Sequence, residues 1–268
     1  MSVGLLLLTN ASGSIACYLI LWFMAQRLKD VTFVAAYWPL GMVLLAWNSF
    51  FETGPATPRK LLLAGLCALW GLRLAAYLNW RWQTHGPDRR YQALLSGAQE
   101  KRGWSFAAAS LTLVIAPQAL LQFVVCLPVQ LGMLATEPRR FGLLATVGAE
   151  LTVLGLIFET AADWQLARFK AAPANRGRVL DTGLWRYSRH PNYFGDACVW
   201  WGLWMIAAET RPALWSLAGP IVLTLILTGW RGASAIERDL RLSRPGYDDY
   251  ARRTSRFFPL PPKRMAAG

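Results

Sequence analysis

The chain has 268 residues, of which 54% are hydrophobic and 14 are tryptophan, and it carries a formal net charge of +13. Four cysteines without CxxC or ligand-like spacing and two isolated histidines exclude a disulfide framework or a metal cage as the organising feature, so we expect no metal. The positive charge does not indicate nucleic acid, because no nucleic-acid-binding module or aromatic-interleaved basic stretch accompanies it.

Apolar runs of about twenty residues, the length that crosses a bilayer core, recur along most of the chain. They predict an all-α integral membrane protein with about seven transmembrane helices, and six is the alternative count. In chain order the predicted spans are 2–26, 31–51, 61–80, 106–135, 141–166, 195–208 and 212–230. The fourth span contains Pro117 and Pro128, which predict a kink or tilt. The first span lacks a basic leading segment and a cleavage site, so we expect it to be retained.

Lysine and arginine concentrate on one side of the predicted membrane. With seven spans, 22 of the 28 basic residues fall in the segments 27–30, 81–105, 167–194 and 231–268, all on one side. Five fall on the opposite side. By the positive-inside rule the side with 22 is cytoplasmic. We therefore expect the N-terminus outside and the C-terminus in the cytoplasm.

A polar motif, "GLWRYSRHPNYFGD", runs directly into the apolar stretch "ACVWWGLWMIAA". Pro191 suits a first helical position, so the helix would present free amides, which bind anions, to the cytoplasm. Arg186 and Arg189 precede it and suit phosphate, while Asn192 and Asp196 share one helix face and suit sugar hydroxyls or an amide-bearing ring. The cluster predicts a nucleotide site. The alternative is an ordinary membrane interface, with arginines for topology and an aromatic belt.

Neither GxGxxG nor GxxxxGK[ST] occurs, so a nucleotide would be held between helices and cytoplasmic loops. Glu159 and Asp163 lie four residues apart near the cytoplasmic end of the fifth predicted span and share a helix face. The tail "ERDLRLSRPGYDDYARRTSRFFPLPP" alternates Arg, Asp and Tyr and ends in an aromatic and proline run, which favours folding back on the membrane. The alternative for the tail is a solvated amphipathic helix on anionic lipid.

These motifs carry a family resemblance. The loop motif with its following helix, the tail "PGYDDYARRTSRFFP", and the segments "LWGLRLAAYLNWRW" and "DRRYQALL" resemble the steroid 5-alpha-reductase superfamily, most closely its bacterial DUF1295 branch. The resemblance extends from about residue 31 onward. It implies a reductase of the bacterial inner membrane that acts on CH–CH groups, like a 3-oxo-5-alpha-steroid 4-dehydrogenase. Within one membrane domain, 1–268, residues 1–135 would enclose a flat apolar substrate such as an enone steroid, and residues 141–268 would hold NADPH at the cytoplasmic end.

The resemblance also implies cofactor-binding positions. The family's cofactor asparagine and following acidic residue match Asn192 and Asp196, and its acidic residue in the preceding helix matches Asp163. Together with Arg189 of the loop, the other expected cofactor-binding residues are Lys170, Arg178, Tyr187, Arg231, Tyr247, Tyr250 and Arg256. Glu159 departs from the family, because the mammalian steroid enzymes have an asparagine there.

The implied reaction needs a hydride delivered to the β carbon of an enone while an acid polarises the carbonyl. The mammalian enzymes carry an adjacent Gln and Glu in an early helix, and the first three spans here contain no such pair. Tyr37, Glu52 and Tyr77 are the available candidates for the acid. The expected partners are a lipophilic small molecule and membrane lipid, with neither nucleic acid nor an obligatory protein partner.

Two other classes remain open. The isoprenylcysteine carboxyl methyltransferases share an Arg-His-Pro-x-Tyr loop and a tail rich in Tyr and Arg, but they use S-adenosylmethionine. A non-enzymatic lipid-binding protein would explain the helices but not the polar cluster. Asn192 directly after the proline, followed by Asp196, favours the reductase.

Overall fold

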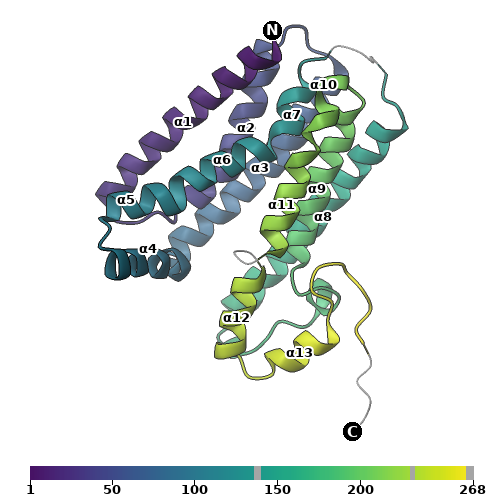
Figure 1. The fold of residues 1–268 in the computed structure, drawn as a ribbon. Coiled ribbons are helices and arrows are strands. Elements are labelled where there is room, and N and C mark those ends of the chain that lie inside the picture. The colour runs from purple at the N-terminus through teal and green to yellow at the C-terminus, as the bar shows by residue number, and fades with distance from the viewer. Residues whose placement is uncertain (136–139, 230–232, 264–268) are drawn as a thin grey trace. The chain divides into compact units, whose positions relative to one another are not determined.

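The computed structural model describes residues 1–135, 140–229 and 233–263, and its regular elements within these ranges are all helices (Figure 1). The chain divides into two compact units. Unit 1 comprises Met1–Thr146 and Leu203–Gly219, and unit 2 comprises Val147–Gly202 and Pro220–Gly268. The candidate catalytic residues lie in unit 1 and the expected cofactor-binding residues lie in unit 2. Arg231 is outside the described residues.

Six helices are long and apolar enough to cross a membrane, judged by length and composition over the described residues. They are Val3–Leu28, Val34–Glu52, Pro58–His85, Phe106–Gly132, Leu143–Ala171 and Arg211–Thr228. The expected count of seven included a span at 195–208, which forms part of helix α9, Pro191–Ala208. This helix is not among the six. Its first turns contain the polar residues Asn192 and Asp196.

Unit 1 begins with the long helices α1 (Val3–Leu28), α2 (Val34–Glu52) and α3 (Pro58–His85), followed by α4 (Arg89–Arg102). Side chains cap three of these helices at their N-termini, where backbone amides lack helical partners. Ser2 accepts from Leu5, Thr57 from Lys60, and Asp88 from Arg90. Residues that commonly cap helices therefore mark the starts of these three helices in the sequence.

The fourth predicted span is interrupted near both of its prolines. It consists of α5 (Phe106–Ser110), the π-helical turn η1 (Leu111–Ile115), α6 (Ala116–Val125) and α7 (Leu127–Gly132). Pro117 and Pro128 lie at the starts of α6 and α7, where a residue without a backbone N–H is tolerated. The predicted kinking of this span is confirmed.

A buried ion pair between Arg59 and Glu209 stabilises unit 1. Arg59, which is 2% exposed, pairs with Glu209 at 2.8 Å and donates to the carbonyl of Ile206 at 2.9 Å. Glu209 in turn accepts from the backbone amides of Gly142 at 3.1 Å and Ala145 at 2.9 Å, near the start of α8 (Leu143–Ala171). The short elements α10 (Arg211–Leu214) and η4 (Trp215–Leu217) complete the unit.

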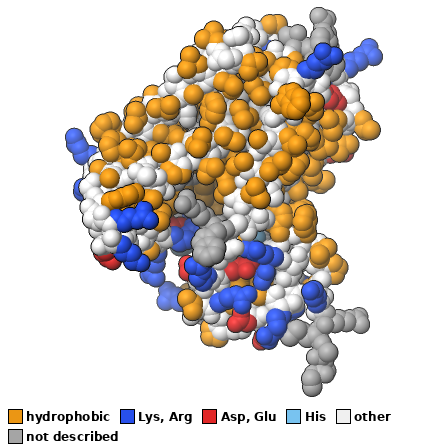
Figure 2. All heavy atoms as spheres, in the orientation of Figure 1, with side chains coloured by type: hydrophobic (Ala, Val, Ile, Leu, Met, Phe, Trp, Pro, Cys, Tyr) orange, Lys and Arg blue, Asp and Glu red, His pale blue; other side chains and the backbone are white. Residues whose placement is uncertain are grey.

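Unit 2 contains most of α8 and α9, and the part of α11 (Ala218–Thr228) that follows Gly219. Between α8 and α9 lie two short turns, η2 (Pro173–Asn175) and η3 (Gly183–Arg186). After α11 come the amphipathic helix α12 (Ala233–Ser243) and α13 (Tyr247–Arg253). Lys and Arg side chains gather over α12 and α13, as Figure 2 shows.

Candidate functional site

Glycines bring α8 and α9 into close contact. A Cβ atom added at Gly195 would lie 2.6 Å from the backbone N of Glu159 and 2.7 Å from the carbonyl O of Gly155. One added at Gly202 would lie 2.4 Å from the carbonyl O of Gly148. The glycines are spaced seven residues apart on each helix, so the contact repeats along one face of both helices. Small residues at such positions let membrane helices approach closely.

The same two faces carry the polar residues singled out in the sequence. One and two turns beyond Gly155, α8 presents Glu159 and Asp163, which are 3% and 4% exposed. Asn192 and Asp196 lie in the first turns of α9, and Asp196 is 7% exposed. The Nδ2 of Asn192 donates to a carboxylate oxygen of Asp163 at 3.1 Å. The structure therefore brings two predicted cofactor residues, Asn192 and Asp163, into contact. Together with the buried Glu159 and Asp196 of the same two helices they are here called the acid–amide cluster.

The loop before α9 is tied to α8 beside this cluster. The indole N–H of Trp185, a buried side chain, donates to the carbonyl of Ala162 at 3.1 Å, and the backbone amide of Leu184 donates to Gln165 at 3.0 Å. Gly183 has a φ of 60°, which favours glycine at this turn. A Cβ atom there would also lie 2.6 Å from the side chain of Gln165. The loop is thus held close to the end of the acid–amide cluster.

Residues 254–263, here called the C-terminal strap, run along the same loop. The backbone amide of Arg189 donates to Ser255 at 2.9 Å, and the amide of Leu260 donates to Tyr187 at 3.1 Å. The hydroxyl of Ser188 adds a bond to the carbonyl of Phe257 at 2.8 Å. These bonds show that the tail folds onto the Arg-His-Pro loop, while its expected contact with the membrane stays a prediction.

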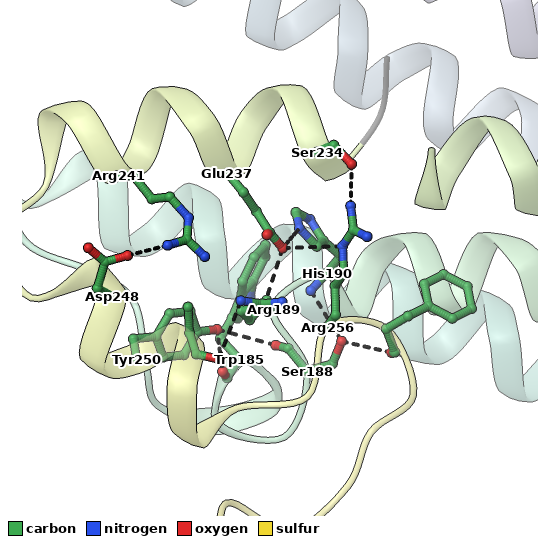
Figure 3. A network of polar contacts seen from close by, with 12 residues as sticks. Trp185, Ser188, Arg189, His190, Ser234, Glu237, Arg241, Asp248, Tyr250 and Arg256 are labelled. Atoms are coloured by element: carbon green, nitrogen blue, oxygen red, sulfur yellow. Dashed lines mark hydrogen bonds and ion pairs between the residues drawn. The ribbon is translucent and has the colours of Figure 1, made fainter. Parts of the chain in front are cut away.

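A single carboxylate, Glu237 of α12, links the loop and the strap (Figure 3). Its Oε1 lies 3.0 Å from Nε2 of His190, 3.3 Å from Nε of Arg189 and 3.7 Å from Nε of Arg256. Tyr250 of α13 adds hydrogen bonds from its hydroxyl to the carbonyls of Trp185, at 2.6 Å, and of Ser188, at 3.3 Å. This cluster around Glu237 is here called the latch.

The latch shifts the pKa values of its members. Burial lowers the pKa of His190, and the charges of Arg189 and Arg256 lower it further against the opposing effect of Glu237. Burial alone would raise the pKa of Glu237, but the hydrogen bond from His190 and the two arginines outweigh it, so that pKa is lowered. Glu237 is therefore an anion, and His190 tends toward its neutral form. Burial raises the pKa of Tyr247 to about 12, so this phenol keeps its proton.

The remaining predicted cofactor residues lie apart from the acid–amide cluster or on the surface of unit 2. Tyr247 and Tyr250 pack ring against ring in α13, at 5.8 Å between centroids. Lys170 and Arg178 are exposed, and the side chain of Tyr187 is 42% exposed. Arg189, expected near phosphates, and Arg256, expected to bind the cofactor, lie in the latch. The roles of all these residues in cofactor binding stay predictions.

The candidate acids in unit 1 do not form one group. Tyr37 packs edge-on against the ring of Tyr18 at 5.2 Å, and Tyr77 stacks on Trp80 at 5.9 Å. Glu52 is exposed and is the last residue of α2. It lies about 22 Å along the helix from Tyr37, at 1.5 Å per residue. Whether any of the three is the acid stays a prediction.

Sequence reasoning missed the importance of Glu237, although the residue begins the quoted tail segment. Its partners at positions 189 and 190 are more than forty residues away in the chain, and no local spacing indicates the contact. The amphipathic pattern of the segment could have indicated that Glu237 is buried. Glu237 lies on the strongly amphipathic helix α12 and is 8% exposed, while Arg238 and Asp239 beside it are exposed. A buried charge on such a helix needs a charged partner.

The fold and the site define a multi-pass helical membrane protein with a polar, tail-covered loop at the start of α9. The chain belongs to the family described as protein of unknown function DUF1295, whose model matches residues 21–254. It is also similar to the uncharacterized protein C594.04c of Schizosaccharomyces pombe, with 25% identity over 265 residues. That match covers 90% of this chain and 76% of the relative. No solved structure matches the chain with significance.

Proposed function

We propose that the protein is a membrane-embedded reductase that uses NADPH to reduce a carbon–carbon double bond conjugated to a carbonyl in a lipophilic substrate. The observation that carries the proposal is the acid–amide cluster on the facing sides of α8 and α9. Glu159 and Asp163 are buried within α8, one of the six candidate membrane helices, where ionisable residues are costly and mark a functional site by default. The resemblance to the steroid 5-alpha-reductase superfamily supports the same reading.

The donor set fits a dinucleotide in chemical terms. Carboxylates of Asp163 and Asp196 accept hydrogen bonds from ribose hydroxyls or a carboxamide NH₂, and Asn192 both donates and accepts. The exposed Arg178 and Arg186 supply forked donors that match phosphate oxygens. Bound there, NADPH would supply the hydride, while the protein aligns the reactants, excludes water and polarises the carbonyl. The substrate would be taken from the bilayer, and the site would face the cytoplasm of a bacterial inner membrane.

Calorimetric titration of the purified protein with NADPH and, separately, with S-adenosylmethionine tests the cofactor. We expect NADPH to bind, and Asn192→Ala and Asp196→Ala to weaken it about tenfold each, the effect of losing one or two hydrogen bonds. Asn48→Ala is the control, because Asn48 donates to Asn10 at 2.8 Å within unit 1 and its loss affects stability without touching the cluster. Unchanged NADPH affinity in folded Asn192→Ala and Asp196→Ala proteins would refute the assignment.

The reaction is tested with deuterated NADPH and a panel of enone steroids and terpenoids. Deuterium at the β carbon of a product would support the proposal. Tight NADPH binding with no transfer to any enone would mean a different chemistry. Methyl transfer from S-adenosylmethionine would instead favour the methyltransferase class. Tyr37→Phe, Glu52→Gln and Tyr77→Phe are compared for turnover, since loss of the acid lowers turnover more than cofactor affinity.

A further inference from the structure

Unit 1 contains a cavity of about 340 Å³ between α1 and the η1–α6 segment. Its wall is almost entirely apolar and includes Ile15 and Leu19 of α1, Ile115 of η1 and Leu120 of α6. Small-molecule pockets typically measure about 300–1,000 Å³ and are lined mainly by hydrophobic side chains. The cavity is therefore large enough for a small ligand, and its wall indicates an apolar one.

The cavity is bordered by residues on the lipid-facing surface of the helices. Among the lining side chains, Ile15 is 56% exposed, Leu19 is 42% exposed and Leu120 is 64% exposed. They belong to two of the helices that are long and apolar enough to cross a membrane. Hydrophobic side chains also dominate the face of α1 and α6 that is visible in Figure 2. A ligand would reach the cavity from the hydrocarbon of the bilayer rather than from water.

One polar side chain at this cavity stands out. Tyr18 lines it and is 2% exposed, and its hydroxyl has no hydrogen-bond partner among the described residues. A buried hydroxyl without a partner costs about 1–3 kcal/mol. The neighbouring polar side chains of unit 1 are bonded, since Gln122 donates to the carbonyl of Trp38 at 2.7 Å and Gln118 donates to the hydroxyl of Tyr91 at 3.1 Å. Tyr18 thus has a donor to offer a ligand.

The opposite wall of the cavity has irregular backbone. Leu111 and Ile115, the two ends of the π-helical turn η1, both line it. A π-helical turn inserts a residue into a helix, shifts the side chains that follow, and occurs frequently at functional sites. Pro117, two residues beyond the turn, also removes a backbone donor from this helix. The wall facing Tyr18 is therefore shaped by the sequence and is not a regular helix surface.

We propose that this cavity binds an apolar molecule carrying one hydrogen-bond acceptor, a ketone or ester carbonyl, and that the Tyr18 hydroxyl donates to that oxygen. The molecule enters laterally from the bilayer past Ile15, Leu19 and Leu120. Identifying it as the substrate rests on the proposed reductase function, whereas its binding does not. If the bound molecule is the substrate, the Tyr18 hydroxyl donates the hydrogen bond to its carbonyl oxygen, in place of the expected acids Tyr37, Glu52 and Tyr77.

The test measures equilibrium binding of two radiolabelled probes to the full chain in lipid nanodiscs, without NADPH. The probes are 5α-androstan-3-one and its parent hydrocarbon 5α-androstane, which differ by one carbonyl. Tyr18→Phe should weaken binding of the ketone about tenfold and leave binding of the hydrocarbon unchanged, because it removes one hydrogen bond and no apolar area. Ala119→Phe fills the cavity and should abolish binding of both probes.

Tyr91→Phe is the matched control, because it also removes a tyrosine hydroxyl from unit 1, but Tyr91 does not line the cavity. Binding of both probes should persist in this variant. The unliganded Tyr18→Phe protein should melt no earlier than the parent, since the hydroxyl it loses had no partner. Equal affinity of Tyr18→Phe and the parent for the ketone, full binding in Ala119→Phe, or no binding of the ketone to the parent would each overturn the proposal. NADPH titration of the same samples reports separately on the proposed function.

Discussion

The Glu237 carboxylate provides the sharpest test of how the C-terminal strap is held. Its Oε1 lies 3.0 Å from His190, 3.3 Å from Arg189 and 3.7 Å from Arg256. Glu237→Gln keeps the shape of the side chain and an acceptor oxygen for His190 but removes the negative charge. We expect the strap to open more often while the helices of unit 2 remain folded.

The size of the effect follows from the geometry. An ion pair at 3.3 Å is worth about 5 kcal/mol before desolvation, at an effective dielectric constant of about 20. Burying the carboxylate offsets part of this, and the Arg256 side chain, at 43% exposed, adds little. Removing one partner of a buried pair costs about 3–5 kcal/mol. Because the bond to His190 is kept, we expect about 3 kcal/mol, or roughly a hundredfold in the opening equilibrium.

Hydrogen exchange measures that equilibrium at the amides of Arg189 and Leu260, which donate across the strap. Both should exchange roughly a hundred times faster in Glu237→Gln, because a loss of about 3 kcal/mol shifts the opening equilibrium by that factor. Asp249→Asn is the control, because Asp249 pairs with Arg252 on the exposed surface and such pairs contribute little. Exchange in Glu237→Gln that matches this control would show that the latch does not hold the strap.

Three further predictions address packing, pH and topology. Gly195→Ala should destabilise the protein by about 1–3 kcal/mol, because its Cβ atom has no room, whereas Gly65→Ala, with open space, should be neutral or stabilising in thermal unfolding. Burial lowers the pKa of His190 below its ordinary value of 6.5, so protonation of His190 at low pH should destabilise the closed strap. Protection of the strap amides from hydrogen exchange, corrected for intrinsic rates, should therefore be complete above pH 6.5 and fall as the pH drops. Cysteines placed at the exposed Arg176 and Arg211 flank α9, so their reaction with impermeant reagents from opposite sides would show that α9 crosses the membrane as a seventh span, whereas reaction from one side would contradict the seven-span topology.

The acid–amide cluster could be predicted from the sequence because helix geometry is local. Residues four apart in a helix share a face, so spacing alone predicts that Asn192 lies beside Asp196 in α9 and Glu159 beside Asp163 in α8. The sequence did not predict which faces of the two helices meet. That depends on the glycines at matching intervals of seven, whose meaning appears only when both helices are seen together. The same holds for the kinked fourth span, where two prolines sufficed to predict the interruptions but not the π-helical turn.

The latch and the cavity could not be predicted in this way. The latch depends on the turn between α12 and α13, where Gly246 has a φ of 82°, and on a strap whose bonds to the loop are mostly made by backbone atoms. Backbone bonds leave no side-chain signature in the sequence. Tyr18 lies in an apolar run where a tyrosine is ordinary, and only the missing partner of its hydroxyl distinguishes it. Such an absence is a property of packing in three dimensions.

Substitutions of Arg189 and Arg186 distinguish the proposed cofactor site from the latch. Its Nε pairs with Glu237 at 3.3 Å, and its Nη1 donates to the carbonyl of Ala251 at 3.4 Å, so the strap and its helices already use two sides of this guanidinium. Arg186, three residues earlier, is exposed. If phosphate binds mainly to Arg186, then Arg186→Ala should weaken NADPH binding several-fold and leave the exchange of the Leu260 amide unchanged, because a charged hydrogen bond is worth about 1.5–3 kcal/mol. Arg189→Ala should instead accelerate that exchange strongly and affect NADPH binding less. The reverse pattern would show that Arg189 is the phosphate ligand and that the strap must release it before the cofactor can bind.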